Sequence, residues 1–490
     1  MSLADHGWRT EHAGRAALIV DAADYYVHAR HAMMKARERI LLIGWDFDTR
    51  IILDRGFPRD GAPTELGPFL TWLADSRPDL CINILTWDVA AVKLLGRGTT
   101  AFRLLRWMAR PNITFLPDDA HPFGASHHQK IVVIDDAFAF CGGIDMTVSR
   151  WDTREHLDDD ERRRRPFTGR RSMPWHDASM AVDGDAAKAL GDLARLRWEI
   201  AGGAPLPEPS AGSDPWPDGL EPQFRDLDVT IARTRGLNGE VEELREIEAM
   251  FVAMIADVRR HAYVETQYFA SRAIAEAICK RLDEDDGPEF VIVNPKVADG
   301  WLEEEVMGAA RAELVDALRQ HPNHHRIRIY TPVTHRGADI YVHAKVMIVD
   351  DRVLRVGSAN MNNRSMGLDS ECDLVIEGTD DAMRATIAGL RDDLLGEHLG
   401  IDPGIVGETL TMTGSLIETV ERLRGSGRTL MPFDPPDKGT LQRDLARSQA
   451  LDPEHPDQAF EPAQNGGLVN GIRRRTRRMR RRVRRRVRRN

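Results

Sequence analysis

The feature that most constrains this chain of 490 residues is an internal repeat. The segment SHHQKIVVIDDAFAFCGGIDM at 126–146 and the segment YVHAKVMIVDDRVLRVGSANMNN at 341–363 share the spacing H-x-K-x4-D, and their histidines lie 215 residues apart. The sequences around the two copies match as well, which is the signature of a duplicated folding unit. Whatever fold holds the first copy must therefore be built a second time.

The flanks of each copy alternate short apolar runs with segments of helical periodicity. This pattern indicates an α/β sandwich whose largely buried sheet is flanked by helices. Four pairs of runs, one member in each half, predict strands: 37–48 and 259–270, 81–88 and 289–295, 113–118 and 327–333, and 176–184 and 371–378. A helix is predicted after the last strand of each half. We expect two homologous lobes with mixed sheets, related by a pseudo-twofold axis, with the active site at the lobe interface.

Composition divides the chain into five parts. Residues 202–222 are rich in Pro and Gly and predict a linker between a first lobe, 1–201, and a second lobe, 223–425. Residues 426–471 have the composition of a disordered linker, and residues 472–490 form an arginine-rich tail.

The remaining composition is that of an ordinary globular protein, with 42% hydrophobic and 29% charged residues. No run of about 20 apolar residues predicts a membrane span, and the N-terminus lacks the pattern of a secretory signal. Four scattered cysteines predict reduced thiols instead of disulfides or a metal knuckle, namely Cys81, Cys141, Cys279 and Cys372. We therefore expect a cytoplasmic protein.

The repeated motif brings together residue types that suit chemistry on a phosphate. On a strand, H-x-K sends both side chains to one face, so His128 with Lys130, and His343 with Lys345, point the same way. Asn360, after the Gly-rich turn, adds an amide. Imidazole, ammonium and amide together can attack, protonate and stabilise a tetrahedral oxyanion.

A metal site is the competing interpretation, because His127 adjoins His128. A lysine ammonium in each copy would repel a divalent cation, so we reject a metal site and expect neither a metal nor a cofactor in this protein.

These motifs resemble the phospholipase D superfamily, whose signature is two copies of H-x-K-x4-D, here HQKIVVID and HAKVMIVD. The segments GGIDMTVSRWDTREH, PWHD, ETQYF and GSANMNNRSMGLDSE are similar to the catalytic core of the eukaryotic-type enzymes, and the resemblance covers about residues 10–400. It implies a two-step displacement through a phosphohistidine, with His128 as nucleophile, His343 as general acid and then base, and Lys130, Lys345 and Asn360 binding the phosphate oxygens. The residues themselves do not distinguish the two histidines.

Four acidic residues complete the expected site. A nucleophilic imidazole needs a carboxylate on its second nitrogen, and the repeat alignment offers Asp177 for His128 and Glu371 for His343. Asp135 and Asp350 belong to the signature but lie about 23 Å from the histidines along an extended strand. We expect these two to bind turn amides.

The two halves differ at one position, because Asp145 stands where Asn360 stands in the second copy. An anion facing a phosphate would repel it, so we expect Asp145 to bind a loop or Arg150. Five aromatic residues are candidates for the wall of the substrate entrance: Trp45, Trp87, Trp151, Tyr268 and Phe269. The run DDDERRRR at 158–165 predicts a solvated, mobile loop near the cleft.

The tail, IRRRTRRMRRRVRRRVRRN, holds 13 of the 67 basic residues and leaves an acidic body. Its apolar or small residues recur every three or four positions, which on a helix forms one stripe among arginines. An anionic bilayer surface would neutralise such a segment and accept the stripe, whereas nucleic acid is the competing partner.

We therefore expect a monomeric phospholipase D, peripheral at the inner membrane surface, that hydrolyses glycerophospholipids to phosphatidic acid and can transfer phosphatidyl groups to alcohols. The alternatives are a phosphatidyltransferase similar to cardiolipin synthase, a nucleic-acid phosphodiesterase, and a non-catalytic scaffold.

Overall fold

The computed structural model describes residues 2–56, 58–88, 99–107, 109–166, 168–210, 212–297 and 301–434, without the side chains of residues 101, 301–307 and 309. The arginine-rich tail and residues 435–471 of the expected second linker lie outside this range.

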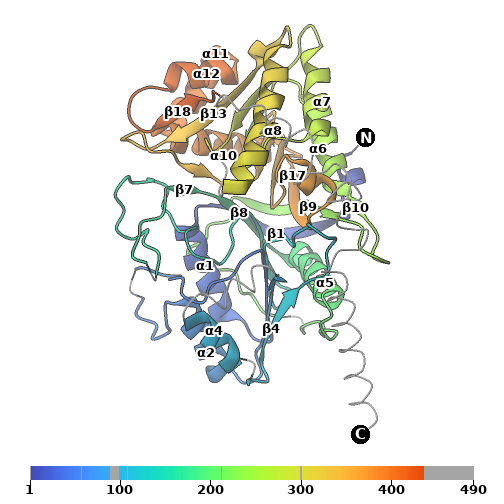
Figure 1. Ribbon diagram of the computed structural model, residues 1–490, viewed down its shortest axis with the longest axis vertical. Helices are drawn as coiled ribbons and strands as arrows, with labels where there is room; N and C mark the ends of the chain where they lie inside the picture. Colours follow the sequence, from blue (N-terminus) through green and yellow to red (C-terminus); the bar gives the residue numbers. More distant parts are fainter. Residues whose placement is uncertain are drawn as a thin grey trace.

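The strands of both halves join in one 16-stranded mixed sheet (Figure 1). The first half supplies β1 (Arg9–Val20), β2 (Arg39–Gly44), β3 (Cys81–Trp87), β4 (Ile113–Asp118), β5 (Ile131–Ile134), β6 (Phe138–Gly142) and β8 (Ala178–Asp183). The second half supplies β9 (Phe224–Arg235), β10 (Leu244–Arg245), β11 (His261–Glu265), β12 (Glu289–Val293), β13 (Ile327–Val333), β15 (Val346–Val349), β16 (Val353–Gly357), β17 (Glu371–Glu377) and β18 (Thr429–Pro432).

The strand order is β18-β13-β12-β11-β15-β16-β17-β9-β1-β8-β6-β5-β2-β3-β4, with β10 paired to β9. Outward from the β1–β9 pair, each half runs through its strands in the same order. The duplicated strands therefore occupy corresponding places in the two halves of the sheet. The expected strand pairs of the repeat are all present.

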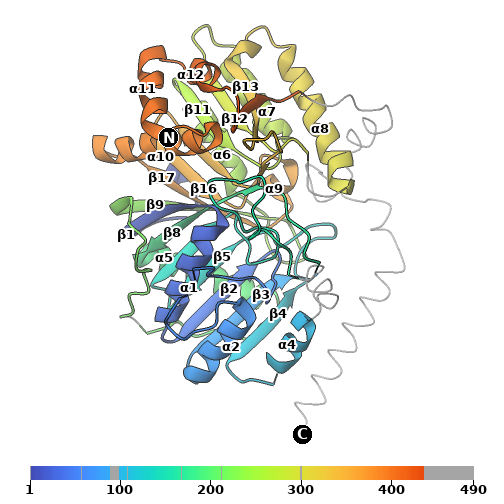
Figure 2. The same cartoon turned by 90° about the vertical axis from the view of Figure 1, so that its left-hand side faces the viewer.

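The two halves are joined through β1 and β9, which lie side by side at the junction in Figure 2. They pair antiparallel, from Arg9 opposite Ile231 to Ala16 opposite Phe224. We did not predict these strands, because their first halves carry several exposed charged residues and only their ends become apolar runs. A second, smaller contact between the halves is the parallel pair β7 (Trp175–His176) and β14 (Tyr341–Val342).

Helices cover both faces of the sheet. The first half contributes α1 (Ala22–Lys35), α2 (Leu66–Ser76), α4 (Thr99–Trp107) and α5 (Gly184–Ile200), and the short 3-10 helix η1 (Leu3–His6) precedes β1. The second half contributes α6 (Glu246–Ala256), α7 (Arg272–Leu282), α8 (Trp301–Arg319), η2 (His324–Arg326), α9 (Asn363–Gly367), α10 (Asp381–Leu399), α11 (Pro403–Thr413) and α12 (Leu416–Leu423). Among the described residues, no helix combines the length and the apolar character that a membrane span requires.

The core has three parts. One large cluster, containing residues of α5 and α10, runs along one face of the sheet through both halves. The opposite face is covered separately, by α1 and α2 in the first half and by α6 and α7 in the second. This shared cluster packs the two halves together as one body.

The segment at 202–222 has no helix or strand in its described residues, as its composition predicts, but it packs on the first half. Trp216 is buried against Phe138, and its carbonyl accepts a hydrogen bond from Lys35 Nζ (2.7 Å). The ordered second half extends past residue 425, because β18 pairs with β13. All four cysteines are free thiols.

Candidate active site

Both H-x-K segments lie in the junction between the halves, immediately before β5 and β15. The strands begin one residue after each lysine, so the histidines precede the strands and do not belong to them. Each segment is held by the other half: the His128 amide donates to the Ser370 carbonyl (3.0 Å), and the His343 amide donates to the His176 carbonyl (2.7 Å). The duplicated motifs thus enter one region from opposite sides.

The carboxylates that hold the histidines are exchanged relative to our expectation. His128 Nδ1 contacts Glu371 (2.9 Å to Oε2), and His343 Nδ1 contacts Asp177 Oδ2 (2.7 Å). We expected each acid to serve the histidine of its own half, because equivalent strand positions suggested it. That pairing was wrong, since the loops cross the junction and place each acid beside the opposite motif.

Two hydroxyl groups fix Glu371 in place. Ser358 Oγ donates to Oε2 (2.5 Å), and Ser365 Oγ donates to Oε1 (2.8 Å). Both acids are fully buried. With Nδ1 of each imidazole engaged in this way, Nε2 is the nitrogen left for chemistry.

The two motif lysines make the same backbone contact, each in its own half. Lys130 Nζ donates to the His128 carbonyl (2.9 Å), and Lys345 Nζ donates to the carbonyl of His343. Each ammonium also meets a second oxygen: Asp145 Oδ2 lies 3.2 Å from Lys130, and Gln267 Oε1 lies 3.4 Å from Lys345. These contacts fix the positive charges beside the imidazoles before any substrate arrives.

Asn360 and Asp145 break the symmetry of the site. Asn360 is buried in the turn after β16, and its Oδ1 has no hydrogen-bond partner among the described residues. Asp145 accepts a hydrogen bond from the Trp45 amide (2.9 Å) and pairs with Lys130. Asp145 therefore binds a loop, as we expected, and it also reduces the positive charge on the first-half side.

Asp135 and Asp350 lie away from the histidines and bind backbone amides. Asp135 accepts three N–H groups at the start of β2, from residues 37–39, at 2.7–2.8 Å. Asp350 does the same for residues 259–261 at the start of β11, at 2.7–3.0 Å. Although the motif includes both aspartates, these contacts are structural.

Burial controls the protonation of the site. It lowers the pKa of His128 and of His343 well below 6.5, and the neighbouring lysines act in the same direction. Burial raises the pKa of Glu371 to about 8 and lowers that of Lys345 to about 7. Both imidazoles are therefore neutral near pH 7 in the free protein.

The aromatic residues divide into two groups. Trp45 packs edge-on against His128, with ring centroids 6.4 Å apart, and stacks on Trp87, and both indoles are partly exposed. Tyr268, also partly exposed, accepts a hydrogen bond from Gln267. Phe269 is fully buried in the hydrophobic core, so our expectation that it walls the entrance was wrong. Trp151 packs in the core of the first half and also lines a cavity.

Sequence reasoning missed Trp175 and a role for Arg150 at this position. Trp175 lies 5.1 Å from the His343 ring, and the Arg150 guanidinium lies over the Trp175 ring at 4.0 Å. The sequence offered one sign of Trp175, because this residue belongs to the segment PWHD. Only the folded chain shows that β7, which contains Trp175, lies against the H-x-K motif of the other half. A cavity of about 980 Å³, lined among others by Tyr26, Arg55 and Trp151, is lined by neither of the two motif histidines.

Comparisons with known proteins agree with this fold and motif. The family model described as "Cardiolipin synthase, PLD-like domain" matches residues 251–388. Phospholipase D A of Dictyostelium discoideum is 26% identical over 471 residues, covering 79% of this chain and 36% of its own length. Cardiolipin synthase A of Yersinia pseudotuberculosis is 26% identical over 284 residues, covering 56% of this chain and 49% of its own.

The crystal structure of phosphatidylserine synthase from Haemophilus influenzae superimposes with a TM-score of 0.54 at 13% identity, over 84% of this chain and 95% of that chain, which shows a common fold. Fold and site together define a duplicated α/β protein with two H-x-K histidines at one junction. The family model and the curated relatives named phospholipase D support the phospholipase D superfamily for this chain. It spans 28–36% of the length of the first curated relatives it matches.

Proposed function

We propose that this protein is a phospholipase D that cleaves the distal phosphodiester bond of glycerophospholipids, giving phosphatidic acid and the free headgroup. The observation that carries the proposal is the pair of neutral imidazoles from opposite halves, each with Nδ1 held by a buried carboxylate. The curated relatives named phospholipase D, which match 57–79% of the chain in the first three cases, support the lipid as substrate.

In the first step, His128 Nε2 attacks phosphorus and the P–O bond to the headgroup breaks. His343 gives its Nε2 proton to the departing alkoxide. The negative charge of the bound phosphate raises the pKa of His343, which burial lowers in the free protein, and so stabilises the protonated imidazole. Lys130, Lys345 and Asn360 stabilise the equatorial oxygens, at a few kcal/mol for each such donor in the transition state.

In the second step, His343 takes a proton from water, the hydroxide attacks phosphorus and the P–N bond to His128 breaks. An alcohol in place of water gives a phosphatidyl alcohol by the same route. Glu371 and Asp177 hold the imidazole orientations throughout.

The experiment that tests this proposal incubates the full chain with mixed phospholipid vesicles and ethanol, and in parallel with single-stranded DNA. We expect phosphatidic acid and phosphatidylethanol from the wild-type protein and neither from His128→Ala. DNA cleavage without lipid turnover would contradict the proposal and favour a nucleic-acid phosphodiesterase.

A phosphatidyltransferase is the second candidate, favoured by the family match at 251–388 and by the Yersinia relative. The same vesicles separate the two when they contain phosphatidylglycerol and no ethanol. Cardiolipin as the main product would select the transferase, whereas phosphatidic acid as the main product selects the hydrolase.

We also propose that residues 472–490 attach the enzyme, as a monomer, to the anionic inner surface of the cytoplasmic membrane. Their basic residues and apolar stripe support this placement.

A further inference from the structure

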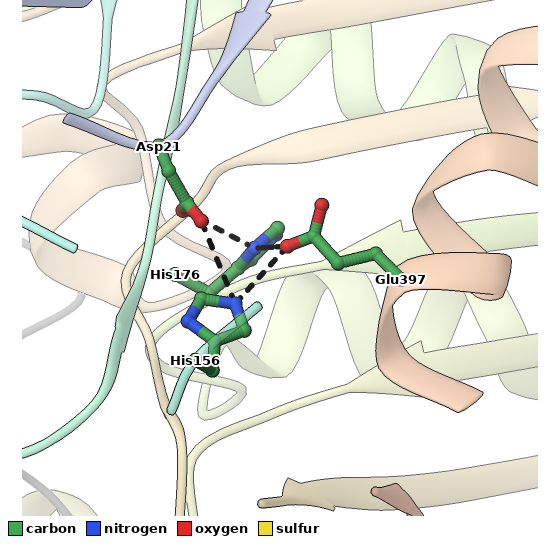
Figure 3. A group of neighbouring side chains, drawn as sticks. All are labelled: Asp21, His156, His176 and Glu397. Carbon is green, nitrogen blue, oxygen red and sulfur yellow. Dashed lines mark hydrogen bonds and ion pairs between the residues drawn. The ribbon is translucent and has the colours of Figure 1, made fainter. Parts of the chain in front are cut away.

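A second cluster of histidines and carboxylates combines residues of both halves (Figure 3). Asp21 follows β1, His156 lies in the loop after β6, His176 belongs to β7, and Glu397 belongs to α10. Three come from the first half and one from the second. All four are buried, none more than 5% exposed.

The potential ligand atoms of these four residues have the spacing of a small metal site. His156 Nε2 lies 3.1 Å from Glu397 Oε1 and 3.5 Å from Asp21 Oδ2. His176 Nδ1 lies 2.8 Å from the same Glu397 oxygen and 3.5 Å from Asp21 Oδ1. Four ligands at about 2.0 Å from a tetrahedral ion would stand about 3.3 Å apart. The observed distances straddle this value.

One oxygen in the cluster lacks the partner that burial requires. Asp21 Oδ2 accepts no hydrogen bond from any described residue, and its nearest cation-forming neighbour is His156 Nε2 at 3.5 Å. An unpartnered carboxylate oxygen costs free energy in a dry interior unless a cation meets it.

The second nitrogen of each imidazole faces another carboxylate. His156 Nδ1 contacts Asp152 Oδ2 (3.0 Å), and His176 Nε2 contacts Glu265 Oε2 (2.9 Å). Metal-binding histidines have this arrangement, in which the carboxylate fixes the tautomer and increases the basicity of the ligand nitrogen.

These outer carboxylates are themselves held. Arg163 Nη1 donates to Asp152 (2.9 Å), and Tyr263 Oη donates to Glu265 (2.6 Å). Arg163 belongs to the run at 158–165, which we expected to be solvated: five of its eight residues are exposed, whereas Asp160 and Arg163 are buried.

The charges of the cluster call for a divalent cation. Asp21, Asp152, Glu265 and Glu397 contribute four buried carboxylates. Arg163 pairs with Asp152, and Arg154 is shared between Glu397 and Asp393. His398 contacts Glu265, and its pKa is lowered by burial, so it adds no charge. At least two negative charges remain, and a buried charge without compensation is strongly destabilising. Either one divalent ion or two protonated imidazoles would neutralise them.

We propose that Asp21, His156, His176 and Glu397 bind one divalent transition-metal ion that joins the two halves. Two imidazole nitrogens and two carboxylate oxygens at tetrahedral spacing select Zn²⁺. The site lies outside the H-x-K motifs, where the lysines argue against a metal, and it departs from our expectation that the protein holds none.

The ion would also position the reaction machinery. Asp177 follows His176 in sequence, and its amide donates to Asp21 Oδ1 (3.0 Å). Asp177 in turn holds His343. A metal ion bound to Asp21 and His176 would therefore fix the backbone at Asp177, whose carboxylate holds His343.

Metal content of the untagged full chain is the first test. We expect close to one zinc per chain by plasma mass spectrometry, and its loss in Glu397→Gln and in Asp21→Asn. His261→Gln is the matched control: His261 is buried in an ion-pair network at the start of β11, outside the cluster, so its variant should keep the zinc. Circular dichroism establishes that each variant is folded, and Asp21→Asn makes the smallest change should Glu397→Gln unfold.

Cobalt substitution is the second test, because it reads the geometry directly. Protein stripped with a chelator and titrated with Co²⁺ should develop the intense visible bands of tetrahedral cobalt, saturating at one equivalent and displaced by Zn²⁺. The chelator should also lower the Tm of the wild-type chain but not that of Asp21→Asn. Wild-type protein that carries no metal and binds no tetrahedral Co²⁺, or variants that bind it as the wild type does, would overturn the proposal and leave two protonated histidines in the cluster.

Discussion

At the scale of single residues, the exchange of carboxylates between the halves defines the site. Glu371 holds His128 and Asp177 holds His343, so each imidazole depends on the half to which it does not belong. The sequence predicts the histidines, lysines and acids, because their types and spacing carry the chemistry. It could not predict the pairing, because two equivalent acids lie at two equivalent strands and only the crossing of loops at the junction decides between them.

The carboxylate exchange predicts different defects in two variants. Glu371→Gln should slow formation of the phosphohistidine about a hundredfold, because an amide holds Nδ1 of His128 less firmly than the carboxyl group it replaces. Asp177→Asn should mainly slow hydrolysis of the intermediate, because His343 then acts as the base. Rapid-quench kinetics with a chromogenic phosphodiester separates the two steps. Slow hydrolysis in Glu371→Gln and slow formation of the phosphohistidine in Asp177→Asn would instead support the pairing of each acid with the histidine of its own half.

The environment of His128 predicts its ionisation. Burial, Lys130 and Lys345 lower its pKa well below 6.5, so the cation forms only under acidic conditions and the neutral ring persists as the pH falls through the ordinary range. Nitrogen NMR of ¹⁵N-histidine-labelled protein, with His128→Asn to assign the signal, should show a neutral imidazole at pH 6.5. A midpoint at or above that pH would contradict the burial we describe.

At the scale of elements, the strands of the repeat follow from their apolar runs, whereas β1 and β9 were missed. Their exposed, charged first halves hide the strand pattern, and their pairing partner lies over 200 residues away. The 16-stranded sheet depends on this pair, because it carries the sheet from one half to the other. Local pattern predicts each half, but long-range pairing decides how they join.

Asp135 and Asp350 belong to the repeated motif, but their contacts are with backbone amides and not with the histidines. Asp135→Ala leaves three amide groups without their charged acceptor, so the free energy of unfolding should fall by about 3 kcal/mol or more. Asp350→Ala should do the same in the second half. Urea unfolding measures this loss, and kcat of the folded fraction should change little. A variant of unchanged stability with no activity would assign the aspartates to catalysis.

At the scale of the whole molecule, an acidic body carries a basic tail. Deletion of residues 472–490 should weaken binding to anionic vesicles at least about a hundredfold, since each basic residue near the surface contributes about 1 kcal/mol. Sedimentation with vesicles of phosphatidylcholine and phosphatidylserine measures this, and added salt should weaken binding of the full chain. Hydrolysis of a soluble phosphodiester should be unchanged.

The matched control keeps every arginine and replaces Met479, Val483 and Val487 by Ser. Loss of vesicle binding by this variant, with binding to DNA retained, is the result we expect from an apolar stripe that enters the bilayer. If the variant kept both vesicle binding and DNA binding, the apolar residues would have no part in attachment, and the tail would be identified as a nucleic-acid binder.

The central claim is that His128 and His343, from separate halves, act in turn on one phosphorus atom. Stopped-flow kinetics with p-nitrophenyl phosphocholine tests it most directly, because nitrophenolate leaves without needing a proton. We predict that His343→Asn releases a burst close to one equivalent and then nearly stops, with phosphocholine retained on His128, and that His128→Asn gives no burst. Equal loss of the burst in both variants, or a burst from His128→Asn, would contradict the account.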